Sequence, residues 1–115
     1  MDSELLRLKC PHADYERFLV AIDEVMSNIH NHSGSPELSV AVWRVMDNIG
    51  VEIGDSGVAF DVVAHSVNPT TKTARELKCG GMGLFMVGKL MDKVDYRRTF
   101  GRNIVTLTRH VGTEG

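Results

Sequence analysis

The sequence predicts a two-layer α/β sandwich in which helices cover one face of a mixed, mostly antiparallel sheet. Apolar residues recur at helical spacing in two segments, and strand-like segments come in consecutive pairs around short turns. Paired strands favour antiparallel neighbours over the alternating units of a parallel sheet. The 115 residues fit one compact unit without repeats, so we predict a single domain over residues 1–115.

The first predicted helix covers residues 14–33. Its apolar side chains recur at three- and four-residue steps, which places them on one face: Phe18, Leu19, Ile22, Val25, Met26 and Ile29. A run of serine, glycine and proline at residues 33–36 ends this helix. Leucines before the helix, at residues 5, 6 and 8, suggest a short strand.

Two hairpins are predicted. Strands over 37–46 and 49–54 flank the turn residues Asp47-Asn48, and strands over 93–99 and 103–109 close the chain. In the first strand, one set of alternate residues is aliphatic, Leu38, Val40 and Val42, and the other set is Ser39, Ala41 and Trp43.

A second helix is predicted over residues 83–92, where apolar residues dominate. The segment 62–80 before it has loop composition and no period. A polar connection of this length in so small a domain is usually functional or mobile, and this one could act as a lid loop.

The composition limits the class of protein. The chain carries 13 Lys and Arg against 15 Asp and Glu, a formal charge of −2, whereas proteins that coat nucleic acid normally have a basic excess. No apolar run approaches the roughly 20 residues that span a bilayer. The acidic start also lacks the order of a secretory signal. We therefore expect a cytoplasmic protein that contacts neither nucleic acid nor a membrane directly.

Glu24 and Asn28 stand four residues apart, so they project from one face of the first helix, opposite its apolar face. An amide oxygen suits the Mg²⁺ ion that accompanies ATP, and a carboxylate can orient or deprotonate an attacking hydroxyl. The same spacing is common on solvated helix faces, which stay the alternative.

A second carboxylate, Asp55, follows a predicted strand in the turn Asp55-Ser56-Gly57. Such a carboxylate can accept a hydrogen bond from an exocyclic amino group such as that of adenine, and Gly57 would let a base lie against bare backbone. Asp and Gly are also ordinary turn residues, so a simple turn is the alternative.

Glycines 80, 81 and 83 open the second helix. Backbone N–H groups at a helix start can face a phosphate, and the helix N-terminus adds partial positive charge. A flexible hinge is the alternative, and a Walker A loop is excluded because no Lys-Ser or Lys-Thr follows. Lys72 and Arg75, in the preceding loop, could fold over phosphates or be ordinary surface charges.

The order and spacing of these motifs resemble the nucleotide-binding boxes of the histidine-kinase-like ATPase superfamily, in particular the anti-sigma-factor serine protein kinases of bacteria. The first box, E-x-x-x-N-x-x-x-H, corresponds to Glu24, Asn28 and His32. The second corresponds to Asp55, Gly57, Phe60 and Asp61. The third, a glycine turn entering a helix that ends in L-M-D-x-V, corresponds to Gly81, Gly83, Leu84, Leu90, Met91, Asp92 and Val94.

The resemblance implies a Bergerat-type fold that binds Mg²⁺ and ATP. It implies Asn28 as the metal ligand, Glu24 as the general base for a partner's serine hydroxyl, and Asp55 as the residue that reads adenine. Lys72 would belong to the lid. The remaining nucleotide contacts would come from Gly57 and from the backbone of Gly81, Met82, Gly83, Leu84 and Phe85. Such kinases phosphorylate an anti-sigma-factor antagonist and, in its absence, bind a sigma factor; a homodimer is possible.

The sequence departs from the family pattern at three places. Only residues 1–13 precede the first helix, so we expect an N-terminally shortened domain, which affects partner binding and dimerisation more than ATP binding. Ala59 stands where glycine is common. Arg102-Asn103 replaces the family's Gly-Thr pair, so the usual threonine on the adenine side is absent.

Three functions of different classes stay open. The first is an anti-sigma regulatory factor with serine protein kinase activity, and the second is a non-catalytic ATP-binding module that acts as a partner-binding switch. The third is an α/β domain with no nucleotide site. Phosphoryl transfer to a protein distinguishes the first from the second, and ATP binding that depends on Asn28 and Asp55 excludes the third.

Overall fold

The computed structural model describes residues 5, 7–33, 37–63 and 82–111. Its helices and strands are, in chain order, α2 (His12–Asn28), the π-helical turn η1 (Ile29–Ser33), β1 (Leu38–Val45), β2 (Asn48–Asp55), α4 (Met82–Leu90), β3 (Lys93–Thr99) and β4 (Arg102–His110). The predicted order of helix, strand pair, helix and strand pair is confirmed. None of the described helices is long and apolar enough to cross a membrane.

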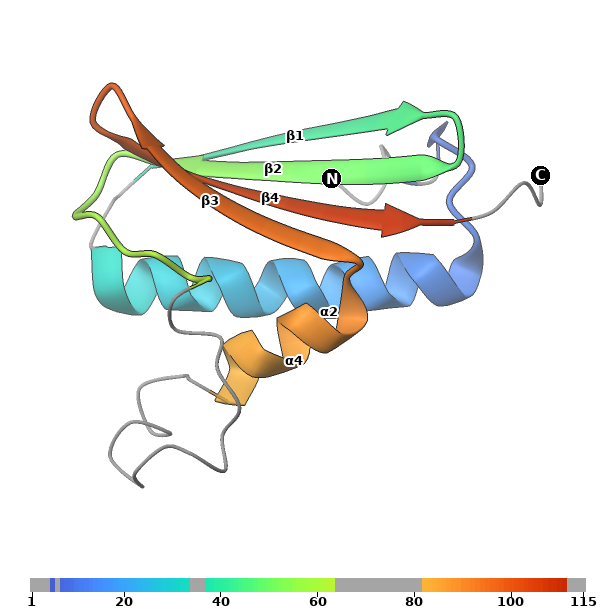
Figure 1. The fold of residues 1–115 in the computed structure, drawn as a ribbon, viewed down its shortest axis with the longest axis horizontal. Helices are drawn as coiled ribbons and strands as arrows, with labels where there is room; N and C mark the ends of the chain where they lie inside the picture. Colours follow the sequence, from blue (N-terminus) through green and yellow to red (C-terminus); the bar gives the residue numbers. More distant parts are fainter. Residues whose placement is uncertain (1–4, 6, 34–36, 64–81, 112–115) are drawn as a thin grey trace.

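The four strands form one sheet in the order β1-β2-β4-β3. All three pairings between them are antiparallel. Both helices lie on the same face of this sheet, as Figure 1 shows. The predicted two-layer α/β sandwich is therefore confirmed, with β2 and β4 as its central strands.

The core lies between α2 and the two central strands. Side chains along a strand point alternately to opposite faces, so every second residue of β2 and β4 faces the helices. The buried apolar residues of β2 and β4 on this face are Ile49, Val51, Ile53, Val105 and Leu107. They pack in one cluster with Phe18, Ala21, Ile22 and Val25 of α2 and with Leu84 and Val87 of α4.

Several predicted boundaries shift by one or two residues. The first helix begins at His12, and its α-helical part ends at Asn28 before continuing as a π-helical turn, a geometry that often occurs at functional sites. The first hairpin turns at Met46-Asp47, because Met46 takes a left-handed backbone conformation with φ of 55°. Asn48, expected in the turn, already pairs with Val45.

Two further expectations change. Residues 5 and 7 are helical, so the short strand predicted there is wrong. The second helix ends at Leu90 instead of residue 92, because the Asp92 N–H donates to the carbonyl of Thr108 and already follows the sheet. Most of the predicted lid, including Lys72, lies outside the described residues.

Candidate functional site

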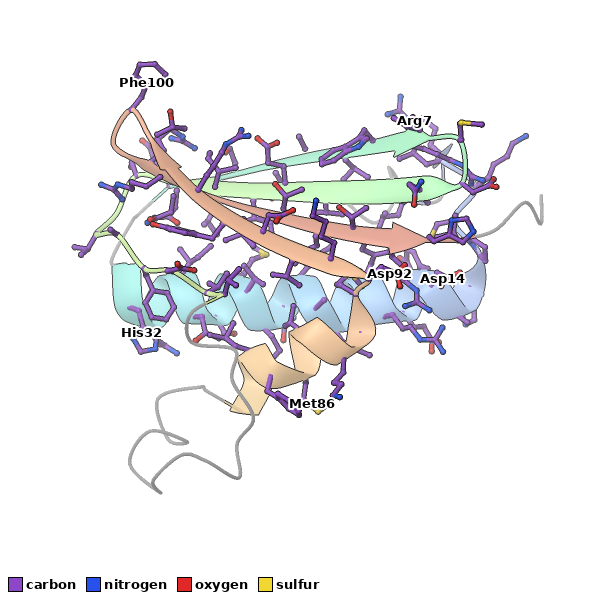
Figure 2. All side chains as sticks on the ribbon, in the orientation of Figure 1. Arg7, Asp14, His32, Met86, Asp92 and Phe100 are labelled. Carbon is purple, nitrogen blue, oxygen red and sulfur yellow. The ribbon has the colours of Figure 1, made fainter. Side chains whose placement is uncertain are left out.

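The first two predicted boxes meet at one end of the sandwich. Glu24 and Asn28 lie in the last two turns of α2, and Asp55 is the last residue of β2. The ring of His32, labelled in Figure 2, stacks on the ring of Phe60 after β2, with centroids 4.6 Å apart and planes 13° from parallel. This contact joins the end of the first helix to the turn that follows Asp55.

Asn28 is buried, with only 3% of its surface exposed, so the prediction that it lies opposite the apolar face of the helix is wrong. Its Nδ2 donates to the Glu24 carbonyl at 2.8 Å, which fixes the orientation of the amide. Its Oδ1 is buried and has no hydrogen-bond partner among the described residues. An unsatisfied buried acceptor costs about 1–3 kcal/mol. Because amide oxygens are Mg²⁺ ligands, this atom fits the predicted metal contact.

Asp55 is 1% exposed and is held through one carboxylate oxygen. Oδ1 accepts hydrogen bonds from the Gly57 N–H at 2.8 Å and from Asn103 Nδ2 at 3.1 Å. Oδ2 is buried without a partner in the part of the chain that the structure describes. An ionised carboxylate only accepts hydrogen bonds. The free oxygen therefore fits a ligand that donates, such as the exocyclic amino group of adenine.

The turn after β2 is fixed by side chains of β3 and β4. Asn103 donates to the Val58 carbonyl at 2.8 Å and accepts from the Phe60 N–H at 3.3 Å. Arg98 donates to the Gly57 carbonyl at 2.7 Å. The bond from the Gly57 N–H to Asp55 is the local bond of an Asx turn. Asp55 thus shapes the turn with one oxygen and leaves the other available.

The third box is described only in part. Gly81 lies outside the described residues, and α4 begins at Met82, with Gly83 in its first turn. Leu84 is buried in the core, so only its backbone is available to a ligand. Phe85 is half-buried, with the Lys89 ammonium 5.3 Å from its ring centroid. A phosphate-binding role for this segment stays a prediction.

The end of the third box has a structural role. The Asp92 carboxylate accepts a hydrogen bond from the His110 N–H, and the Asp92 N–H donates to the Thr108 carbonyl. Asp92 therefore fastens the chain after α4 to the last residues of β4, which orients α4 against the sheet.

Sequence reasoning did not single out Asn103, Tyr96 and Arg98 as site residues. Asn103 drew attention only as a departure from the family pattern. Its pairing opposite Asp55 depends on the register between β2 and β4. The signal available in the sequence was an asparagine at a position where the family usually has a threonine.

Comparisons with known proteins identify the family of the chain. Residues 2–109 match the family described as the histidine kinase-like ATPase domain, and the chain belongs to that family. Serine-protein kinase RsbW of Halalkalibacterium halodurans is 32% identical over 103 residues, which cover 83% of this chain and 62% of that protein. Serine/threonine-protein kinase BtrW of Bordetella bronchiseptica is 28% identical over 96 residues, covering 80% and 68% of the two chains.

Among solved structures, the histidine kinase AdeS of Acinetobacter baumannii superimposes with a TM-score of 0.59 over 86% of this chain and 48% of that chain. At 14% sequence identity, this likeness shows the shared fold alone. The chain thus spans 62% of the RsbW protein of H. halodurans and about half of AdeS.

Proposed function

We propose that this chain is an ATP-binding anti-sigma regulatory factor with serine protein kinase activity, which transfers the γ-phosphate of ATP to a serine of an anti-sigma-factor antagonist. The observation that carries the proposal is a pair of buried oxygens, on Asn28 and Asp55, that have no hydrogen-bond partner among the described residues and stand at the positions of two family boxes. Membership of the ATPase domain family and the names of the serine-protein kinase relatives support it.

In this proposal Asn28 offers Oδ1 as a ligand to Mg²⁺, which when bound neutralises charge on the phosphates. Asp55 offers Oδ2 to the adenine amino group, and Gly57 lies beside the base. The backbone from Gly81 to Phe85 holds the phosphates, and Lys72 folds over them. The last two assignments rest on the resemblance, because residues 64–81 lie outside the described part.

Glu24 acts as the general base. It lies one helical turn before Asn28, and its carbonyl receives the bond from the Asn28 amide. Its carboxylate accepts the proton of the partner's serine hydroxyl while that oxygen attacks the γ-phosphorus. The bond between the γ-phosphorus and the bridging oxygen breaks, and ADP and phosphoserine are the products.

The partners follow from the same resemblance. We propose that the chain binds a sigma factor and an antagonist protein in the cytoplasm, without direct contact to nucleic acid or a membrane, and that it can form a homodimer.

The test is phosphoryl transfer from γ-³²P-labelled ATP with Mg²⁺, after the purified chain is added to a soluble extract of its source organism. An extract without added chain gives the background. We expect label on a serine of a small protein. Glu24→Gln lowers the rate about 10²–10⁴-fold, the usual contribution of a general base. Glu16→Gln changes an exposed glutamate of the same helix and leaves the rate unchanged.

Full transfer by Glu24→Gln would contradict the role of Glu24. ATP binding without any labelled protein would contradict the kinase assignment and favour the non-catalytic switch.

A further inference from the structure

We infer that Asn103 is a positioning residue, which aims the Asp55 carboxylate at the nucleotide base and thereby sets selectivity for an amino-substituted purine. This inference rests on the proposed ATP site. It assigns a role to a side chain of β4 that differs from the threonine usual in the family.

Every polar group of the Asn103 side chain has a partner, although the residue is only 2% exposed. Nδ2 donates to Asp55 Oδ1 at 3.1 Å and to the Val58 carbonyl at 2.8 Å. Oδ1 accepts from the Tyr96 hydroxyl at 2.6 Å, from Arg98 at 3.2 Å and from the Phe60 N–H at 3.3 Å.

These partners allow only one orientation of the Asn103 amide. The Arg98 guanidinium and the Phe60 N–H can donate but cannot accept, so the side-chain oxygen must face them. The amino group is then directed at Asp55. A threonine hydroxyl has a single proton and could not donate to Asp55 and to the Val58 carbonyl at once.

The consequence for Asp55 is an asymmetric carboxylate. Two donors, the Gly57 N–H and Asn103 Nδ2, converge on Oδ1, while Oδ2 has no partner among the described groups. Rotation of the carboxylate would break both bonds. Asn103 therefore helps to hold Asp55 Oδ1 in hydrogen bonds with the protein, and Oδ2 stays available to the ligand.

A carboxylate oxygen in this position distinguishes purines by the group at their six-position. Adenine carries an amino group there, which donates to Oδ2. Hypoxanthine carries a carbonyl oxygen, which cannot donate and faces the carboxylate acceptor to acceptor. Selectivity then depends on how firmly Asn103 fixes Asp55.

The experiment is calorimetric titration of the Mg²⁺ complexes of ATP and of inosine triphosphate into the intact chain. The wild type should bind ATP about 10- to 100-fold more tightly, the range for a hydrogen bond to a charged group. Asn103→Leu keeps the side-chain size, removes the donor and should lower this ratio about tenfold. Tyr96→Phe removes one bond that orients Asn103 and should lower it less. Asn48→Leu, an exposed site on β2, should leave it unchanged.

The ratio separates positioning from general stability. Partial unfolding lowers the affinity for both nucleotides by the same factor, so it does not change the ratio of the two affinities. If Asn103→Leu does not fold, the ratio of affinities measured for Tyr96→Phe tests the inference. A wild type that prefers ATP, with an unchanged ratio in the folded variants, overturns this inference alone. A wild type that binds neither nucleotide overturns the proposed ATP site as well.

Discussion

Asn28 and Asn103 are both buried asparagines, yet they differ in how their polar atoms are satisfied. Asn28 leaves its Oδ1 without a partner in the described structure, whereas Asn103 has a partner for each polar atom. Buried polar groups are nearly always paired, so an exception needs an explanation. The metal contact proposed for Asn28 provides one.

This difference predicts opposite effects of one substitution. Asn28→Leu removes an unsatisfied acceptor along with a single hydrogen bond, so without nucleotide we expect the free energy of unfolding to change by less than about 1 kcal/mol. Asn103→Leu leaves several buried groups unpaired and should cost about 2–4 kcal/mol. Urea denaturation measures both. A loss as large for Asn28→Leu as for Asn103→Leu would mean that Asn28 serves the fold and not a ligand.

At the scale of the elements, β1 and β2 depend on a close approach between Trp43 and Gly50. A Cβ on Gly50 would lie 2.2 Å from the nearest atom of the Trp43 ring, so the indole must move to admit it. We expect Gly50→Ala to lower the free energy of unfolding by about 1–3 kcal/mol, the usual range for overpacking. Urea denaturation followed by circular dichroism measures this loss, because Trp43 is the one tryptophan of the chain.

The chain offers two controls for Gly50. In a Trp43→Ala background the same substitution should cost much less, because the clash is gone. Gly88 lies in α4, and a Cβ added there would meet nothing within 4 Å, so Gly88→Ala should instead stabilise by about 0.5–1 kcal/mol through helix propensity. Equal losses at Gly50 and Gly88 would rule out the steric explanation.

One arginine connects three elements. Arg109 of β4 pairs with Asp14 in the first turn of α2, labelled in Figure 2, and donates to the Leu90 carbonyl at the end of α4 at 2.7 Å. The two charged side chains are only 20% and 13% exposed. Without Arg109, the largely buried Asp14 carboxylate would keep, among the described residues, only the longer contact with Arg17 Nη1, at 3.8 Å.

Arg109→Leu should therefore lower the free energy of unfolding by about 2–4 kcal/mol. Lys93→Leu breaks the exposed pair with Asp95, whose side chains are 69% and 53% exposed, and should cost at most about 1 kcal/mol. Thermal and urea denaturation of the two variants test the contrast. A similar small effect at both sites would show that the Arg109 pair is not needed to join α2 to β4.

Local sequence patterns predicted the helices and strands better than they predicted which residues of different elements lie together. Both hairpins and both helices follow from periodicity and turn residues, with ends misplaced by one or two positions. The register that places Asn103 opposite Asp55 joins strands far apart in the sequence, and no local signal sets it. The burial of Asn28 was missed because it lies where the polar and apolar faces of α2 meet, and helix period alone does not locate that boundary.

In the whole molecule, the proposed ligand contacts α2 and the turn after β2, two segments that lie far apart in the sequence. A ligand that binds the folded state alone stabilises it by mass action, by about 2.7 kcal/mol at one hundred times its dissociation constant. We expect Mg²⁺-ATP to raise the melting temperature by that mechanism in the wild type and not in Asp55→Leu. An equal rise in both proteins would place the nucleotide elsewhere.

Asn28 and Asp55 are proposed to belong to one site for Mg²⁺-ATP. The most direct test is calorimetric titration of ATP with Mg²⁺ and with chelator, on the wild type, Asn28→Leu and the control Asn31→Leu, an exposed asparagine one turn further along. We predict saturable, Mg²⁺-dependent binding to the wild type and the control, and its loss in Asn28→Leu. Binding that is unaffected by chelator or by Asn28→Leu, or no binding to the wild type, would contradict the claim.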